Sequence, residues 1–322
     1  MVSQTEIFKN GELYMIDFTN SMQKNKAYAG ANGGKIAVMY NDEQYMLKFP
    51  PYPTKNKDMS YTNSCISEYI GCKIFELLDI PVQETMIGKY TSKGKTKIVV
   101  ACKDFTRPGI VLQDFASLKN RIIDSERNGY GTDLNDILST IEEQTSVNPE
   151  KLKERFWDMF IVDAFIGNWD RHNGNWGFLY DANTDEVALA PVYDCGSSLY
   201  PQADEEMMQE ILNNKNELNH RVFDIPLSAI TYDGKKINYF KFLSAGEFED
   251  CNKALKRITS RIDMDKVFEI IDNTETITEI QKKFYKTMLS ERKKRILDFA
   301  VSKVFEQEKK QKKKKDKDTQ ER

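Results

Sequence analysis

Two hydrophobic periodicities divide the first hundred residues into strands and one helix. Apolar and polar side chains alternate over residues 34–50 around a turn at 41–43, which predicts a β-hairpin. From Asn63 the apolar positions recur at helical spacing, which predicts a helix over 63–78 that stops before Pro81. Two further strands are expected over residues 84–90 and 95–104.

The remainder of the chain is patterned for helices. Residues 156–166 are apolar on nearly every side, which predicts a central buried helix that leads directly into the segment from Asn168. Short strands near 176–180 and 187–192 are expected to flank a turn. Helices are predicted over residues 112–126, 133–144, 148–167, 204–217, 247–259, 262–272 and 276–306.

These elements predict an α+β fold with two lobes. A small β-rich N-lobe is expected over residues 1–105, and a larger helical C-lobe over 106–307. Residues 308–322 are dense in charge and include the run Lys312–Lys315, which predicts a disordered basic tail. Such a run is compatible either with a solvated tail or with a patch that binds polyanions.

Composition limits the classes of protein to which the chain can belong. Its 322 residues are 40% hydrophobic and 30% charged, which suits one two-lobed domain with a sizeable core. The net charge of -3 gives no general attraction to nucleic acid or to a membrane, so no specific nucleic-acid partner is expected. No long apolar run occurs, and residues 1–12 lack the apolar core of a secretory signal. We therefore expect no membrane span and a cytoplasmic location.

Cysteine and histidine are sparse. The five cysteines form no Cys-x-x-Cys pair, which argues against a disulfide framework or a zinc site and for a reducing compartment. The two histidines, His172 and His220, are too few for a histidine-based metal site or a Ser-His-Asp triad. Cys195 has no basic neighbour in the sequence, so we expect it to have a packing role.

The segment Asp170–Asn175, which reads Asp-Arg-His-Asn-Gly-Asn, is followed later by Asp194-Cys-Gly. An aspartate and an asparagine on a tight loop, with a second aspartate at a later strand end, can form a phosphoryl-transfer site. In this interpretation Asp170 is the catalytic base that orients the acceptor hydroxyl. Asn175 and Asp194 provide hard oxygen ligands for Mg²⁺. The alternative is a loop that uses these residues only as turn formers.

Two other residues of this loop have less specific roles. His172 is expected to be a structural residue that hydrogen-bonds to backbone near Asp194. Arg171 can pair either with a carboxylate or with a phosphate group, and both interpretations stay open.

Lys48 lies in the middle of a predicted strand. Alone it is compatible with an edge-strand lysine that points to solvent. Beside the Asp170 segment it is better explained as a lysine that contacts nucleotide phosphates and pairs with Glu68 on the following helix. The preceding Gly30–Gly34 stretch matches neither the P-loop nor the Gly-x-Gly-x-x-Gly pattern, but its backbone N–H groups can cradle phosphates.

These segments together resemble the HipA-like serine/threonine kinases over most of the chain. The most specific likeness lies in Asp170–Asn175 and Tyr193–Gly196. The resemblance implies a two-lobed protein-kinase-like fold, ATP and Mg²⁺ as cofactors, and transfer of phosphate to serine or threonine of a protein substrate, the kinase itself included. Further segments that carry it are Gly30–Lys35, Leu47–Pro50, Ser67–Tyr69, Ile80–Val82 and Gln113–Phe115.

The resemblance also implies roles for individual residues. Asp170 and Lys48 would be catalytic, and Asn175 and Asp194 would bind Mg²⁺. The segment Val100–Lys103 resembles the linker between the lobes that binds adenine through its backbone. Some family members are bacterial effectors, which leaves export to a host cell open. The implied nucleotide-binding residues are Gly30, Ala31, Asn32, Gly33, Gly34, Lys48, Glu68, Ala101, Lys103 and His172.

Two other functions share these motifs. A phosphoinositide-type lipid kinase carries the same two segments but needs a basic loop after the second. Residues 197–206 are acidic here, which favours a protein acceptor. Ser197, Ser198 and Tyr200 stand where autophosphorylation is expected. The other alternative is a nucleotide-binding pseudokinase scaffold, against which the joint presence of the catalytic and metal-binding candidates argues.

Overall fold

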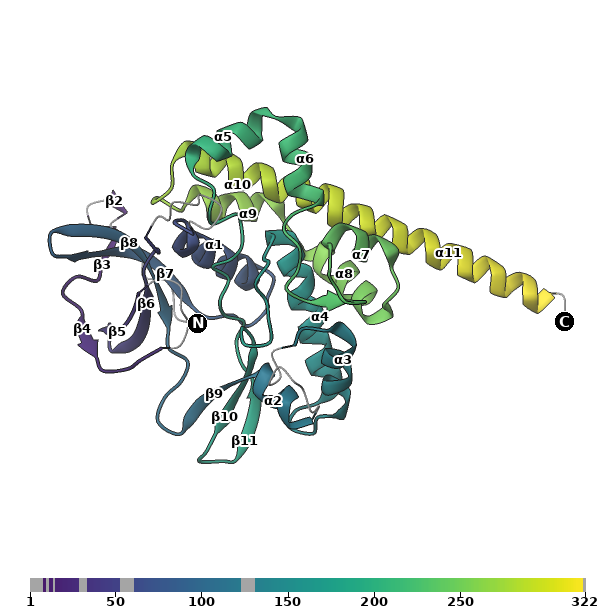
Figure 1. The fold of residues 1–322 in the computed structure, drawn as a ribbon, viewed down its shortest axis with the longest axis horizontal. Helices are drawn as coiled ribbons and strands as arrows, with labels where there is room; N and C mark the ends of the chain where they lie inside the picture. The colour runs from purple at the N-terminus through teal and green to yellow at the C-terminus, as the bar shows by residue number, and fades with distance from the viewer. Residues whose placement is uncertain are drawn as a thin grey trace.

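A computed structural model of the chain describes residues 8–9, 12–13, 15–28, 34–52, 61–122 and 131–320. A β-rich lobe lies beside a larger helical lobe, and a long C-terminal helix extends away from the helical lobe (Figure 1). This is the two-lobed α+β arrangement that the sequence predicts.

The small lobe is built on a mixed six-stranded sheet in the order β3-β7-β8-β6-β5-β4. The predicted hairpin and the two predicted strands form its centre, and two short strands that the pattern did not predict form its edges. Its core includes the fully buried Val38, Leu47 and Ala101. The strands are β3 (Ile16–Asp17), β4 (Met22–Lys24), β5 (Lys35–Tyr40), β6 (Glu43–Lys48), β7 (Thr85–Ser92) and β8 (Lys95–Lys103); β1 (Phe8–Lys9) and β2 (Glu12–Leu13) pair separately.

Helix α1 (Ser64–Leu77) connects the sheet to the helical lobe. Its side chains Ile70, Ile74 and Phe75 lie in the large core cluster that also contains the buried residues of the central helix. A Cβ added at Gly71 would lie 2.8 Å from the Cys195 Cβ, so the helix and the loop after Tyr193 are in direct contact. Although α1 precedes the helical lobe in sequence, it therefore packs as part of that lobe's core.

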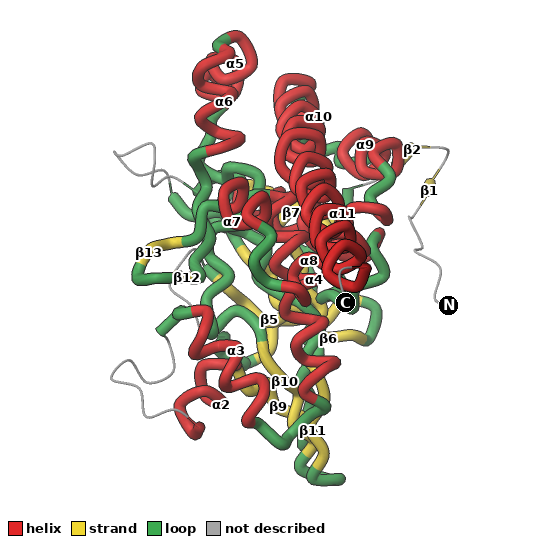
Figure 2. The backbone as a smooth tube through the Cα atoms, turned by 90° about the vertical axis from the view of Figure 1, so that its right-hand side faces the viewer, coloured by secondary structure: helices red, strands yellow, loops and turns green. Residues whose placement is uncertain are grey.

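The helical lobe surrounds α4 (Pro149–Ile166), which is buried over most of its length as predicted. Gly167 ends it in the left-handed conformation at φ 67°, which turns the chain towards Asp170. Helices α2 and α3 lie at one end of this lobe and α5 and α6 at the other (Figure 2). The other helices are α2 (Phe115–Ile122), α3 (Leu134–Glu143), α5 (Glu205–Asn213), α6 (Lys215–Phe223), α7 (Tyr239–Ala245), α8 (Glu249–Arg261), α9 (Met264–Asp272), α10 (Glu279–Arg292) and α11 (Phe299–Gln320), with a π-helical turn at Lys293–Asp298.

A three-stranded antiparallel sheet, ordered β11-β10-β9, lies at the bottom of the view in Figure 1. It comprises β9 (Ile110–Asp114), β10 (Gly177–Asp181) and β11 (Glu186–Leu189). The helix expected over 112–126 is wrong at its start, because residues 110–114 pair with β10 and the helix begins only at Phe115. Pairing with a distant strand outweighs the local helical spacing here.

Two other helix predictions need correction. The helix expected over 204–217 is interrupted at Asn214, whose side-chain oxygen accepts the N–H groups of Asn216 and Glu217 and so begins a new helix. The helix expected over 276–306 begins at α10 and passes through the π-helical turn into α11. The pattern also missed α7 and the hairpin of β12 (Thr231–Tyr232) and β13 (Lys235–Lys236).

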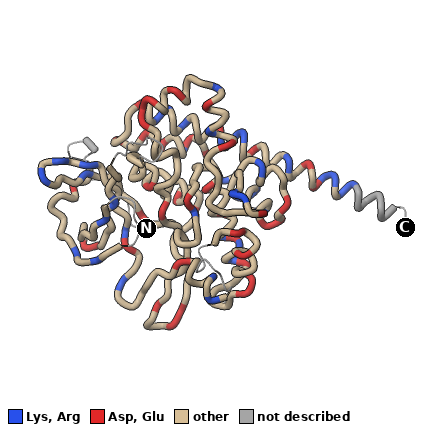
Figure 3. The backbone as a smooth tube through the Cα atoms, viewed as in Figure 1, with Lys and Arg blue, Asp and Glu red and all other residues tan. Residues whose placement is uncertain are grey.

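The described part of the C-terminal segment is helical, whereas the sequence predicts disorder beyond residue 308. Helix α11 continues to Gln320, and lysines recur along it (Figure 3). Its first turns bury Ala300 and Val304 in the core, and Glu308 forms an ion pair with Lys256 at 2.6 Å. Glu, Gln and Lys are strong helix formers, so a helix that is already nucleated by packing can extend through a charged sequence.

Some structural findings concern the classes of site considered from composition. All five cysteines are buried and free. Among the described residues, no group of three or more His, Cys, Asp and Glu side chains is arranged to hold a metal ion. In the same part of the chain, no helix is both long enough and apolar enough to cross a membrane.

We expect Gly71→Ala to destabilise the protein, although alanine normally favours a helix by about 1 kcal/mol. The added Cβ would lie 2.8 Å from the Cys195 Cβ, which forces α1 away from the loop. The free energy of unfolding, measured by chemical denaturation, should fall by about 1–3 kcal/mol. Gly34→Ala is the control, since its added Cβ would meet only the Phe49 ring at 3.8 Å, an ordinary van der Waals contact. A Gly71→Ala protein as stable as the wild type would contradict this close packing.

Candidate active site

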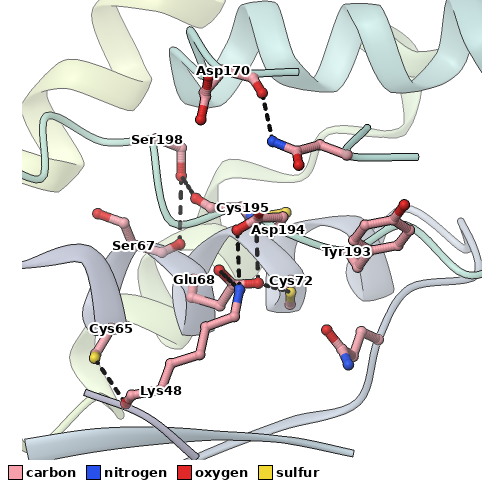
Figure 4. Close-up of polar contacts among 12 residues, drawn as sticks. Lys48, Cys65, Ser67, Glu68, Cys72, Asp170, Tyr193, Asp194, Cys195 and Ser198 are labelled. Atoms are coloured by element: carbon pink, nitrogen blue, oxygen red, sulfur yellow. Dashed lines mark hydrogen bonds and ion pairs between the residues drawn. The ribbon is translucent and has the colours of Figure 1, made fainter. Parts of the chain in front are cut away.

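A cavity of about 680 Å³ lies between the lobes, a size that suits a small-molecule ligand. Residues from four separate parts of the chain line it: Lys48 of β6, Glu68 of α1, the Asp170–Asn175 loop and Asp194. In Figure 4, Lys48 extends towards Glu68 and Asp194, whereas Asp170 lies on a different loop. The structure therefore brings together the residues that the sequence assigned to phosphoryl transfer.

Lys48 makes two ion pairs inside this cavity. Its Nζ lies 2.8 Å from Glu68 Oε2 and 3.0 Å from Asp194 Oδ1. Burial alone would lower the pKa of Lys48, but the carboxylates of Asp194 and Glu68 hold it well above its ordinary value. The Lys48 ammonium in turn lowers the pKa of Asp194 to about 2. Lys48 is thus a fixed cation in the cleft, and its interpretation as a solvent-facing lysine is wrong.

The backbone at Asp194 is held in an unusual conformation. Its φ of 60° is left-handed, a region that costs a non-glycine residue on the order of 1–2 kcal/mol. The next N–H, of Cys195, donates to Glu68 Oε1 at 3.1 Å. Glu68 therefore holds both the Lys48 ammonium and the backbone that aims Asp194 into the cavity.

Arg171 is buried and joins the segments around the site. Its guanidinium donates to the Asp163 carboxylate, with Nε 2.9 Å from Oδ2. Of the two partners that the sequence left open for Arg171, a carboxylate or a phosphate group, the structure shows the carboxylate. It also donates to the carbonyl oxygens of Asn175, at 2.9 Å, and Tyr193. One side chain thus fixes the end of the Asp170 loop and the residue before Asp194.

The loop that carries Asp170 is closed by its own hydrogen bonds. The side-chain amide of Asn175 donates to the Asp170 carbonyl at 2.7 Å, and the Asp170 N–H donates to Asn168 Oδ1 at 3.1 Å. Because the Asn175 nitrogen is used in this way, its Oδ1 remains for a ligand. Asn175 Oδ1 and the Asp194 carboxylate are hard oxygen donors, which fit Mg²⁺ bound together with substrate phosphates.

His172 has the structural role that was predicted, but with a different partner. Its Nδ1 accepts the N–H of Gly174 at 3.0 Å, so it stabilises its own loop and not the backbone near Asp194. The residue also lines the cavity. The nucleotide contact implied by the family resemblance therefore stays a prediction.

The carboxyl of Asp170 has a raised pKa. Burial raises the pKa of its carboxyl above the ordinary aspartate value, and the nearby Asp194 carboxylate adds to the increase, whereas His172 opposes it. A carboxylate with a raised pKa takes up a proton more readily, which suits a residue that receives the proton of an acceptor hydroxyl.

The predicted nucleotide-binding residues of the glycine stretch and of β8 divide into two groups. Gly30, Ala31, Asn32 and Gly33 lie outside the described residues, and Gly34 precedes β5, with its carbonyl accepting the Phe49 N–H at 3.0 Å. Ala101 and Lys103 do not line the cavity. Ala101 is fully buried within β8, and the backbone N–H of Lys103 donates to the Glu84 carbonyl at 2.8 Å. The strand extends through the predicted linker, so residues 104–106 line the cavity instead.

Asp104 organises this linker, and no sequence motif pointed to it. Its Oδ2 accepts hydrogen bonds from Lys26 at 2.6 Å and from Tyr28 and Gln44 at 2.7 Å. Burial alone would raise the pKa of Asp104, but the bonds from Lys26 and Tyr28 hold it at about 2. The linker is thereby tied to the segment that leads into the glycine-rich stretch.

The segment after Asp194 corrects two expectations. Ser198 and Tyr200 are buried, so neither is an exposed phosphate acceptor. The Ser198 hydroxyl donates to the Cys195 carbonyl at 2.7 Å. The Tyr200 hydroxyl donates to the carbonyls of Arg221 and Ile225. Ser197 does line the cavity. The acidic residues 204–206 cap and begin α5 and do not line it, so their charge does not decide between lipid and protein acceptors.

Comparison with known proteins places the chain in a family. The family model of the HipA-like C-terminal domain matches residues 24–280. The chain belongs to the HipA-like C-terminal domain family. It is 51% identical over 293 residues to serine/threonine-protein kinase CtkA of Helicobacter pylori strain J99, covering 90% of this chain and 89% of that protein. The expected relation to HipA-like kinases is thus confirmed.

Solved structures support the same assignment. The crystal structure of the H. pylori proinflammatory kinase CtkA matches with a TM-score of 0.85 and 49% identity, over 91% of this chain and 99% of that one. The HipA toxin of Shewanella oneidensis, solved with HipB and operator DNA, matches with a TM-score of 0.54 and 18% identity, over 87% of this chain and 68% of that one. The second match shows the fold alone, whereas the first confirms the expectation of a kinase.

Arg171→Met should strongly destabilise the protein, because it leaves the Asp163 carboxylate buried without its cation. We expect the free energy of unfolding to fall by about 3–5 kcal/mol, measured by denaturant titration. Lys253→Met, which removes an exposed ion pair with Glu249, is the control and should be nearly neutral. Equal effects of the two substitutions would contradict the central position of Arg171.

Proposed function

We propose that the protein is an ATP-dependent, magnesium-requiring protein kinase that phosphorylates serine or threonine, including residues of its own chain. The observation that carries the proposal is the Lys48 ion pair with Glu68 and Asp194, in the same cavity as Asp170 and Asn175. The high identity to a protein named a serine/threonine-protein kinase supports it. The protein substrate is expected to present its hydroxyl at the open side of this cavity.

Each residue has a distinct part in the proposed reaction. Asp170 accepts a hydrogen bond from the acceptor hydroxyl and receives its proton as the hydroxyl oxygen bonds to the γ-phosphorus, the bond from that phosphorus to the bridging oxygen breaks and ADP leaves. Lys48 holds the nucleotide phosphates with a charge that Glu68 keeps in place. Asn175 and Asp194 would hold Mg²⁺, which would neutralise charge on the phosphates.

The nucleotide orientation follows from the two ends of the cavity. Lys48 and Asp194 mark the phosphate end, and the Gly30–Gly34 backbone is proposed to cover it. The linker at residues 104–106 lines the cavity elsewhere and is the proposed contact for the base. This moves the proposed adenine contact from Ala101 and Lys103, which belong to β8 and do not line the cavity.

Asp170→Asn should abolish phosphoryl transfer without unfolding the protein. Loss of the base is expected to lower kcat by about 10²–10⁴-fold in an assay with labelled ATP and Mg²⁺. Folding raises the pKa of Asp170, so the folded state favours the neutral carboxyl. The free energy of unfolding therefore falls as the pH rises through that raised pKa, because the charged carboxylate is then buried. The Asn variant should therefore melt at the same temperature or higher at neutral pH.

The matched control for this experiment is Asp233→Asn, at an exposed hairpin tip. It should keep full transfer. Label incorporated by Asp170→Asn at the wild-type rate would contradict the catalytic assignment. Parallel assays with a phosphoinositide vesicle and a generic protein acceptor distinguish a lipid kinase from a protein kinase.

Phosphate placed in the segment after Asp194 should be found on Ser197. Ser198 and Tyr200 are buried and hydrogen-bonded, so they are closed to transfer. Mass spectrometry after incubation with ATP and Mg²⁺ locates the phosphate. Ser197→Ala should remove any label from this segment, and phosphate on Ser198 or Tyr200 in folded protein would contradict the assignment.

A further inference from the structure

Asn63, the residue before α1, bonds to two distant segments of the helical lobe. Its N–H donates to the Pro201 carbonyl at 2.9 Å and its side-chain amide donates to the Ala203 carbonyl at 2.7 Å. Its Oδ1 accepts from Gln281 Nε2 at 3.2 Å. The start of α1 is thus held both by the segment after Asp194 and by α10.

The side chain of Asn63 serves these contacts in place of capping its own helix. An asparagine at this position usually accepts a hydrogen bond from an N–H in the first helical turn. Here the side chain makes no such bond. Gln281 meanwhile uses its Oε1 in the capping box of α10, accepting the Thr278 N–H at 2.9 Å, and its Nε2 reaches Asn63.

The rest of α1 is bonded to the same lobe. In its first turn, the Ser67 carbonyl accepts the Ser198 hydroxyl at 3.4 Å, beside the contact between Cys195 and Glu68. After its end, the Gln83 N–H donates to the Val192 carbonyl at 2.8 Å. The chain from 198 to 203 and the strand before Asp194 therefore hold α1 at both ends.

We propose that Asn63 is a positioning residue for phosphoryl transfer. By fixing the first turn of α1 to residues 201–203 and to Gln281, it keeps Glu68 within ion-pair distance of Lys48. This inference rests on the proposed kinase function. It concerns a residue that does not line the nucleotide cavity and touches no reacting atom.

The consequence for catalysis follows from the two partners of Lys48. If the first turns of α1 shift, Glu68 moves with them and loses the Cys195 N–H, whereas the Arg171 contact with the Tyr193 carbonyl still holds the residue before Asp194. Lys48 then pairs with Asp194 alone, in competition with Mg²⁺ for the same carboxylate. Loss of the tether should therefore lower kcat and also raise the Mg²⁺ concentration needed for half-maximal activity.

The test compares Asn63→Ala with Asn252→Ala. Asn252 also donates from a partly buried side chain to a backbone carbonyl, that of Gly246 at 2.9 Å, and lies far along the chain from the site. Asn63→Ala is expected to lower kcat about tenfold and to raise the half-saturating Mg²⁺ severalfold. Asn252→Ala should change neither, and equal kinetics of the two variants would overturn the proposal.

A double-mutant cycle shows whether Asn63 acts through Glu68. In a Glu68→Gln background the added Asn63→Ala substitution should cause little further loss of kcat, because the group that it positions is already altered. A loss of the same factor in both backgrounds would mean that Asn63 acts elsewhere. Gln281→Glu is the milder variant if Asn63→Ala does not fold, since it keeps the capping oxygen but lacks the donor to Asn63.

Hydrogen exchange separates failure of this inference from failure of the proposed function. In Asn63→Ala the amides of residues 64–70 should exchange faster than in wild type, and in Asn252→Ala they should not. If the two variants exchange as expected but the wild-type protein transfers no phosphate, the kinase proposal is refuted and the role of Asn63 in holding α1 stands. Unchanged exchange in Asn63→Ala would refute the tether whatever the activity.

Discussion

The buried guanidinium of Arg171 holds together the end of α4, the Asp170 loop and the segment before Asp194. It pairs with Asp163 near the end of α4 and donates to the carbonyls of Asn175 and Tyr193. Burying a cation lowers the stability of the fold unless its N–H donors find acceptors. Here the acceptors lie on the elements that carry the candidate catalytic residues. The relative positions of Asp170, Asn175 and Asp194 therefore depend on one charge pair inside the core.

Helix α1 extends this rigid unit across the lobe boundary. Its apolar face lies in the large core, Gly71 lets it approach Cys195, and Glu68 accepts the Cys195 N–H. Glu68 and Asp194 thus belong to one body, whereas Lys48 belongs to the sheet. The two ion pairs of Lys48 join the sheet to this body. The left-handed backbone at Asp194 persists because its surroundings hold it on both sides.

The sequence predicted the parts of this site that depend on local pattern. The buried α4, the β5–β6 hairpin and α1 follow from periodicity, and the Asp170 and Asp194 segments follow from residue spacing. Contacts made by pairing at a distance were not predictable in the same way. Strand β9 was taken for a helix because its partner lies more than sixty residues away, and the partner of Arg171 stayed open because Asp163 is identified only by the fold. The charged end of α11 was taken for disorder because composition does not reveal that its first turns are packed.

The central claim is that α1 and the loops of Asp170 and Asp194 form one body, which Lys48 joins to the sheet. Pulsed electron spin resonance between labels at Glu76 on α1, Lys95 on the sheet and Lys151 on α4, all exposed positions, measures this directly. Addition of Mg²⁺ and a non-hydrolysable ATP analogue should change the distance between positions 95 and 151 and leave that between 76 and 151 unchanged. A change in the distance from 76 to 151, with the distance from 76 to 95 constant, would contradict the account.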